Sequence, residues 1–165
     1  MSQQQIESCI EQQLSGETKE LALDFVSYLA ANGMQMERIG GYWENQHYYG
    51  AKYRNEYVCF ILINGTGDEA EFFPLTIWLE GGNSHWYDRD LQEKPIREIA
   101  WKNVDICAHC GSCGGGTRKR IFGKEFDNVC RTPLRFVNPD SHTMKYLKKI
   151  IEIRKKDILE RESCE

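Results

Sequence analysis

The sequence predicts an α+β fold, an antiparallel β-sheet of four to six strands with N-terminal and C-terminal helices packed on it. Apolar residues recur at helical spacing near both ends of the chain. Short aromatic and β-branched runs separated by glycine turns fill the middle, which indicates an antiparallel meander. The chain has 165 residues, of which 41% are apolar and 28% charged. These values fit one domain over residues 1–165 with its own hydrophobic core.

Two helices are predicted at the N-terminal end. From Ser2 to Leu14, apolar residues return every three or four positions. Ser15-Gly16 interrupts the pattern, which resumes from Glu17 to Asn32 with Ser15 as a helix cap. Gly33 stands where a left-handed C-cap is expected.

Four strands are predicted next, at Met34–Ile39, Tyr42–Tyr53, Tyr57–Asn64 and Phe72–Glu80. Glycine or Asn-containing turns separate them. The run from Val58 to Ile63 is apolar without alternation, which predicts a central strand that is buried on both faces.

The last third is expected to contain a helix at Pro95–Lys102, a hairpin arm at Thr117–Phe122, a strand at Pro133–Val137 and a closing helix to about Arg161. Asn138 is the predicted cap of the closing helix, with Pro139 in its first turn. Its basic residues are expected to point outward into solvent: Lys148, Lys149, Arg154, Lys155 and Lys156.

Four cysteines in the pattern C-x2-C-x2-C-x16-C predict a metal site in a loop at about 105–131. They are Cys107, Cys110, Cys113 and Cys130. Two cysteines separated by two residues can grip one ion from a single turn, and four thiolates suit tetrahedral zinc. A loop this rich in glycine cannot order itself, so bound metal would supply the missing folding free energy, on the order of 10 kcal/mol.

Other uses of these cysteines stay open. An iron–sulfur cluster also uses C-x2-C-x2-C with a remote cysteine, although proline often follows the remote cysteine directly, and here Pro133 comes two residues late. A C-x2-C pair can form a reversible disulfide, but the glycines after Cys113 oppose the helix that would activate it. His109 could replace one thiol as a ligand.

The tryptophans and tyrosines of the meander could line a concave ligand-binding face. The candidate contacts are Trp43, Trp78, Trp86 and Glu44, with Glu37 and Glu80 as further acidic rims. Such a face would suit a flat or cationic small molecule. Packing of these large aromatics in the core is the plainer interpretation.

The charge is distributed unevenly along the chain. Residues 1–100 hold seven Lys/Arg against sixteen Asp/Glu, whereas residues 101–165 hold fourteen against nine. Arg118, Lys119 and Arg120 beside the predicted metal loop form a basic patch that could attract nucleic acid. The acidic first hundred residues would oppose a long polyanion, and a solvated face is the simpler interpretation.

No catalytic constellation is evident, so catalysis is left open and a non-catalytic role is favoured. There is no run of about 18 apolar residues and no secretory signal pattern, which predicts a cytoplasmic protein without membrane association. In that reducing compartment, the seven cysteines are expected to be metal ligands and free thiols rather than disulfides.

Three stretches carry a resemblance to a known family: Ala100 to Asp105, Cys107 to Gly116 and Ile121 to Cys130. Over about Leu21 to Asp157 the chain resembles a family of small, uncharacterised cysteine-cluster proteins from anaerobic Gram-positive bacteria. The resemblance implies that the cysteine cluster is a family feature, and it implies no activity.

Together these observations predict a zinc-stabilised small binding module for a small molecule or a protein. An iron–sulfur redox protein is the alternative from another class. A nucleic-acid-binding regulator that uses the basic metal loop is the third possibility.

Overall fold

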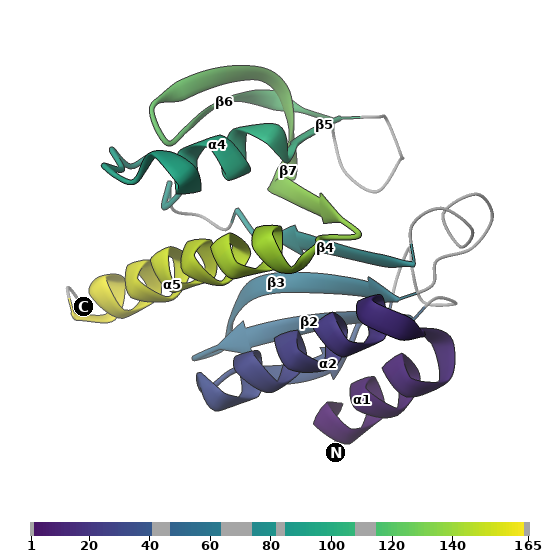
Figure 1. Ribbon diagram of the computed structural model, residues 1–165. Helices are drawn as coiled ribbons and strands as arrows, with labels where there is room; N and C mark the ends of the chain where they lie inside the picture. The colour runs from purple at the N-terminus through teal and green to yellow at the C-terminus, as the bar shows by residue number, and fades with distance from the viewer. Residues whose placement is uncertain (1, 41–46, 64–73, 82–84, 108–114, 164–165) are drawn as a thin grey trace.

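A computed structural model of the chain describes residues 2–40, 47–63, 74–81, 85–107 and 115–163 (Figure 1). The α+β class is confirmed, because an antiparallel sheet runs through the molecule with helices from both ends of the chain. The described helices are α1 (Ser2–Gln13), α2 (Gly16–Ala31), α4 (Lys94–Lys102) and α5 (Ser141–Ser163). The described strands are β1 (Gln35–Arg38), β2 (His47–Tyr53), β3 (Glu56–Ile63), β4 (Leu75–Leu79), β5 (Val104–Ile106), β6 (Thr117–Ile121) and β7 (Lys124–Val137).

The strand order is β1-β2-β3-β4-β7-β5, and β6 pairs with β7 beside this path. The seven strands exceed the predicted four to six, because β5 has three residues and too little apolar pattern to be recognised alone. The strand predicted at Pro133–Val137 is the end of the 14-residue β7. The first half of β7 is mostly polar and exposed, so periodicity does not reveal it.

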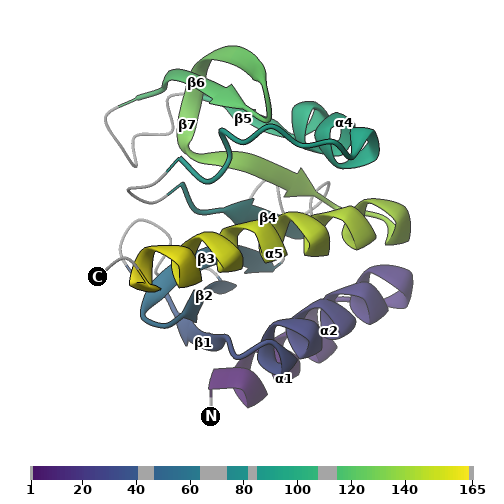
Figure 2. The ribbon, with the colours of Figure 1, turned by 90° about the vertical axis from the view of Figure 1, so that its left-hand side faces the viewer.

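One face of the sheet packs against the helices. Its cross-strand rows are Met36–Ala51–Cys59–Leu79–Leu134 and Arg38–Tyr49–Ile61–Ile77–Phe136. Apolar residues of α1, α2 and α5 close this core, and Figure 1 shows α5 crossing in front of β3. Turning the molecule by 90° shows the β5–β6–β7 region above β4, with α4 beside it (Figure 2). Every residue that this core removes from water contributes hydrophobic stabilisation.

The cap of α5 is Asp140 rather than the predicted Asn138. The Thr143 amide donates to Asp140 Oδ1 at 2.8 Å, and the Met144 amide donates to the Asp140 carbonyl at 2.8 Å. Asn138 instead adopts a positive φ of 49° and donates its amide to the Leu75 carbonyl. The prediction was wrong because Asn138 serves the turn that joins β7 to the helix. None of the described helices combines the length and the apolar character needed to cross a membrane.

Arg154 is the second correction, because it is buried and not outward. Only 1% of the residue is exposed, and its guanidinium donates to the Tyr57 carbonyl from Nη2 at 2.9 Å. It also lies 3.4 Å from Asp157 and 3.8 Å from Glu56. A buried cation is tolerated when carboxylates and carbonyls satisfy it in this way. The pairing fastens α5 to the β2–β3 hairpin.

Candidate functional site

Two of the four predicted metal ligands lie in the described residues, at diagonal positions of one strand pair. Ile106 of β5 pairs with Val129 of β7 in antiparallel register, so Cys107 lies opposite Asn128 and Asp105 lies opposite Cys130. Cys107 follows Ile106, and Cys130 follows Val129. Successive residues of a strand point to opposite faces, so the Cys107 and Cys130 side chains are expected on the same face of the strand pair.

Asn128 holds both described ends of the 108–114 segment. The Cys107 amide donates to the Asn128 carbonyl at 2.8 Å, and Asn128 Nδ2 donates to the Cys107 carbonyl at 3.3 Å. On the other side, a Cβ at Gly116 would lie 2.5 Å from Asn128 Oδ1, so only glycine permits this approach. Asn128 itself has φ +58°, which asparagine tolerates better than most residues. The described residues on both sides of the cysteine-rich segment therefore contact Asn128, which lies two positions before Cys130.

Cys110 and Cys113 lie outside the described residues, as does His109. Within the described part of the chain, no group of three or more His, Cys, Asp or Glu side chains could hold a metal ion. The four-cysteine site thus stays a prediction, of which the structure describes two members and their surroundings.

Asp105 lies beside Cys130 at the edge of the same face. Burial raises the pKa of the Asp105 carboxyl, while the Arg135 charge and hydrogen bonds from Cys130 and Trp78 oppose the shift. The carboxylate thus links the predicted metal ligand Cys130 to the predicted ligand-binding residue Trp78. Composition and spacing did not identify Asp105, since β5 itself was not predicted.

A row of residues crosses the sheet on the face opposite the helical core. Register places Glu37, Gly50, Phe60, Trp78 and Arg135 side by side across β1, β2, β3, β4 and β7. We call the rings of Tyr48, Tyr57, Phe60 and Trp78 on this side the aromatic face. Phe60 stacks on Tyr48 with centroids 5.8 Å apart, and Trp78 meets Tyr48 edge-on at 6.1 Å. Trp78 therefore belongs to a continuous cluster of aromatic rings on this side of the sheet.

Cations already rest on two rings of the aromatic face. The Arg135 guanidinium lies 5.6 Å from the Trp78 ring centroid, and the Lys52 ammonium lies 4.7 Å from that of Tyr57. The Tyr57 hydroxyl donates to Glu37, which raises the pKa of Tyr57 to about 12 together with burial. These contacts demonstrate the chemistry that a cationic ligand would use on this face.

The other predicted contact residues are placed differently. Trp86 is 1% exposed, donates its indole N–H to the Glu80 carbonyl at 2.9 Å and packs edge-on against Phe122. It lies in the core and is separate from the aromatic face. Trp43 and Glu44 fall outside the described residues.

Carboxylates accompany two of the three residues of the predicted basic patch. Arg118 pairs with Glu125 at 2.5 Å and with Asp127 at 3.7 Å. Arg120 pairs with Asp88 at 3.3 Å, and the Lys119 ammonium lies 5.6 Å from the Tyr87 ring centroid. An ion-paired patch of this kind attracts a polyanion less strongly than three unpaired cations would.

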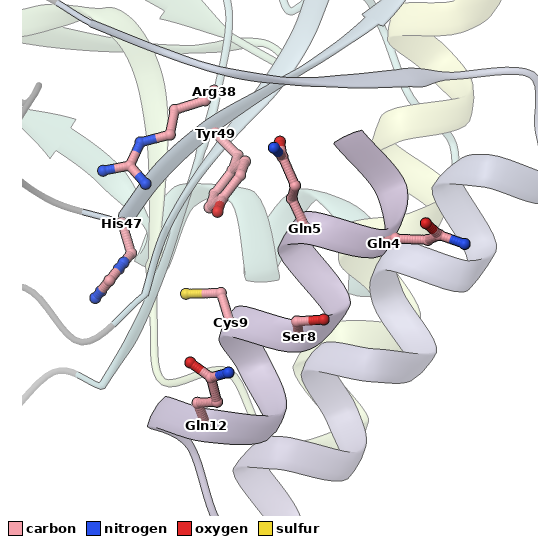
Figure 3. Close-up of a pocket in the computed structure, with 8 residues that line it drawn as sticks. All are labelled: Gln4, Gln5, Ser8, Cys9, Gln12, Arg38, His47 and Tyr49. Atoms are coloured by element: carbon pink, nitrogen blue, oxygen red, sulfur yellow. The ribbon is translucent and has the colours of Figure 1, made fainter. Parts of the chain in front are cut away.

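A pocket of about 490 Å³ lies between α1 and the β1–β2 edge (Figure 3). Its walls include Cys9, Arg38, His47 and Tyr49, with glutamines of α1 along the rim. Burial raises the pKa of the Cys9 thiol, and the nearby Arg38 opposes the shift only in part. The thiol is therefore protonated at neutral pH, which disfavours a nucleophilic role for Cys9.

The structure adds Asp105 and Asn128 to the residues that the sequence suggested, and it places the Arg135 charge near Asp105. All three lie on β5 or β7, and their proximity to the cysteines depends on strand pairing. No family model, no curated protein and no solved structure matches this chain.

Proposed function

We propose that this protein is a small binding module in which a structural zinc ion, held by Cys107, Cys110, Cys113 and Cys130, fixes the β5–β7 strand pair beside the aromatic face. One observation carries the proposal. The strand register directs Cys107 and Cys130 to the same face, next to the residue that holds both ends of the segment containing Cys110 and Cys113.

Chain length supports the participation of all four cysteines. Cys110 is three residues from Cys107, and Cys113 is two residues from Gly115. At no more than about 3.6 Å per residue, each is tethered within roughly 11 Å of an end that lies at Asn128. Zn–S bonds are about 2.3 Å long, so all four thiols must come close to one ion. The short tethers keep Cys110 and Cys113 near enough to Asn128 for this.

The metal contributes to structure in this proposal, and binding takes place on the aromatic face. Four thiolates close the coordination shell of zinc, which leaves no open position for a substrate. Cys130 is joined through Asp105 to Trp78, so an ordered metal site would also order one edge of the aromatic face. A planar or cationic group of a small molecule or a protein segment is the favoured ligand.

Metal content tests the first half of the proposal. Protein purified with and without air is expected to contain one zinc per chain and to be colourless. Cys130→Ser should lose most of the metal, whereas Cys9→Ala should retain it, because Cys9 lies on α1 at the other end of the molecule. Iron with visible absorption would favour a redox protein instead. Full metal content in Cys130→Ser would contradict the four-cysteine assignment.

Fluorescence quenching tests the second half. An N-methylpyridinium cation should quench tryptophan emission saturably through Trp78, and Trp78→Phe should abolish the saturable part. The matched control is Trp86→Phe, since Trp86 lies in the core. Equal quenching of both variants would show that the aromatic face does not bind the cation.

A further inference from the structure

A second pocket lies at the far end of the β6–β7 hairpin from the cysteines. It has a volume of about 490 Å³ and opens between α4, the stretch before it and the hairpin turn. Its lining residues are Asp90, Leu91, Gln92, Arg97, Trp101, Arg120, Phe122, Gly123 and Lys124. The size falls in the range of pockets that bind small organic molecules.

Two cations of this pocket converge on one tryptophan. The Arg97 guanidinium carbon lies 5.8 Å from the Trp101 ring centroid, and the Lys124 ammonium lies 5.4 Å from it. Trp101 is fixed in turn, because its indole N–H donates to the Ile121 carbonyl at 2.7 Å. The ring therefore holds two positive charges near the same opening.

Neither cation has a carboxylate partner among the described residues. Nearby acidic side chains are paired elsewhere: Glu93 with Lys149, Glu98 with Lys94 and Glu125 with Arg118. Arg97 Nε is buried and has no hydrogen-bond acceptor in the described part of the chain. A buried donor without a partner is costly, and an anion in the pocket would satisfy it.

The charges of the lining indicate the kind of anion. The lining contains three cationic side chains, Arg97, Arg120 and Lys124, and one carboxylate, that of Asp90. Arg120 also forms an ion pair with Asp88. This excess of positive charge suits a phosphate monoester, which carries nearly two negative charges at neutral pH, better than a single carboxylate. Guanidinium groups also match the geometry of phosphate oxygens.

The other residues of the pocket wall indicate which groups the rest of the ligand carries. Leu91 and Trp101 offer apolar surface, while the Gln92 amide and the Asp90 carboxylate can hydrogen-bond to hydroxyl groups. A pocket of this volume exceeds what a bare phosphate ion would fill. We propose that the Arg97–Trp101–Lys124 pocket binds a small organic phosphate monoester with hydroxyl groups on its carbon skeleton.

Nuclear magnetic resonance tests this proposal on the 165-residue chain. Glucose 6-phosphate is the probe, with glucose and gluconate as neutral and singly charged controls. The indole resonance of Trp101, assigned with Trp101→Phe, should shift saturably with glucose 6-phosphate and much less with either control. Arg97→Gln and Lys124→Ala should each weaken the affinity by about tenfold or more, because each removes a charged hydrogen-bond donor.

Lys156→Ala is the matched control, since Lys156 is an exposed cation on α5 outside the pocket. Its affinity should equal that of the wild type. Lys124 is exposed at the hairpin, so Lys124→Ala keeps the test valid even if Arg97→Gln unfolds. The proposal is overturned if glucose 6-phosphate does not bind saturably, if inorganic phosphate binds as tightly, or if Lys124→Ala binds like Lys156→Ala.

Discussion

Single charged residues determine how α5 is attached to the rest of the fold. Asp140 accepts the hydrogen bond that begins the helix, and Arg154 joins the middle of the helix to the β2–β3 hairpin. The Asp140 contact is local in sequence, whereas the Arg154 contact depends on the Tyr57 carbonyl, which only the folded chain brings within reach. A lysine-rich and arginine-rich helix therefore has one buried cation among exposed ones, and local sequence does not distinguish them.

Replacement of the cap residue should destabilise the protein in a pH-dependent way. Asp140→Ala removes the hydrogen bond from the Thr143 amide, at a cost of about 1 kcal/mol of unfolding free energy at pH 7. Hydrogen bonds from Thr143 lower the pKa of Asp140 in the folded state. The stabilisation is therefore present above the unfolded pKa of about 4 and is lost as the pH falls below it.

Urea denaturation at several pH values measures this effect. The difference in unfolding free energy between wild type and Asp140→Ala should shrink from pH 7 into the acid range. The difference between Asp140→Asn and Asp140→Ala should not change with pH, because asparagine caps the helix without titrating. A difference between wild type and Asp140→Ala that does not change with pH would contradict the assignment of Asp140 as an ionised cap.

At the scale of elements, the sheet was predictable where its strands carry an apolar pattern. The predicted positions of β1 to β4 agree with the structure wherever it describes them, because alternating or continuous apolar runs mark buried strands. β5 was missed because it has only three residues, and the first half of β7 because its residues are mostly polar; the pairing of the two joins positions far apart in sequence. For the same reason Asp105 and Asn128 could not be connected with the cysteines from spacing alone.

Close packing of β2 against Tyr57 makes Gly50 sensitive to substitution. A Cβ at this position would lie 2.6 Å from Tyr57 Cε1 and 2.9 Å from Ile39 Cδ1. Gly50→Ala should displace the Tyr57 ring and cost about 1–3 kcal/mol of unfolding free energy. Gly40→Ala is the matched control, because no atom lies within 4 Å of its added Cβ. Equal melting temperatures for the two variants would show that the Tyr57 ring moves aside without cost.

At the scale of the whole molecule, two regions differ in what holds them together. The β1–β4 region packs against α1, α2 and α5 through the main hydrophobic core, while β5, β6 and the first half of β7 form an extension that joins this core through Ile121 and Val129 (Figure 2). Strands of this extension carry mostly exposed side chains. The extension should therefore depend on the proposed zinc ion more strongly than the core does.

Removal of metal should loosen the extension first. After treatment with a chelator, backbone amides of β5 and of β7 near Val129 are expected to exchange with solvent much faster, while those of β3 and α5 stay protected. Hydrogen exchange followed by mass spectrometry distinguishes the two regions. Uniform loss of protection in both would contradict this division, and unchanged exchange everywhere would contradict a structural role for the metal.

The contacts of Asn128 also make the protein a convenient acceptor for foreign peptide sequences. Cys107 and Gly116 both contact Asn128 of β7, so the described residues on either side of 108–114 lie close together. A different loop that keeps Cys110 and Cys113 at their positions could be transplanted there without altering the strand register on either side. Libraries at the remaining positions between Cys107 and Gly116 would display variable peptides from a constant scaffold.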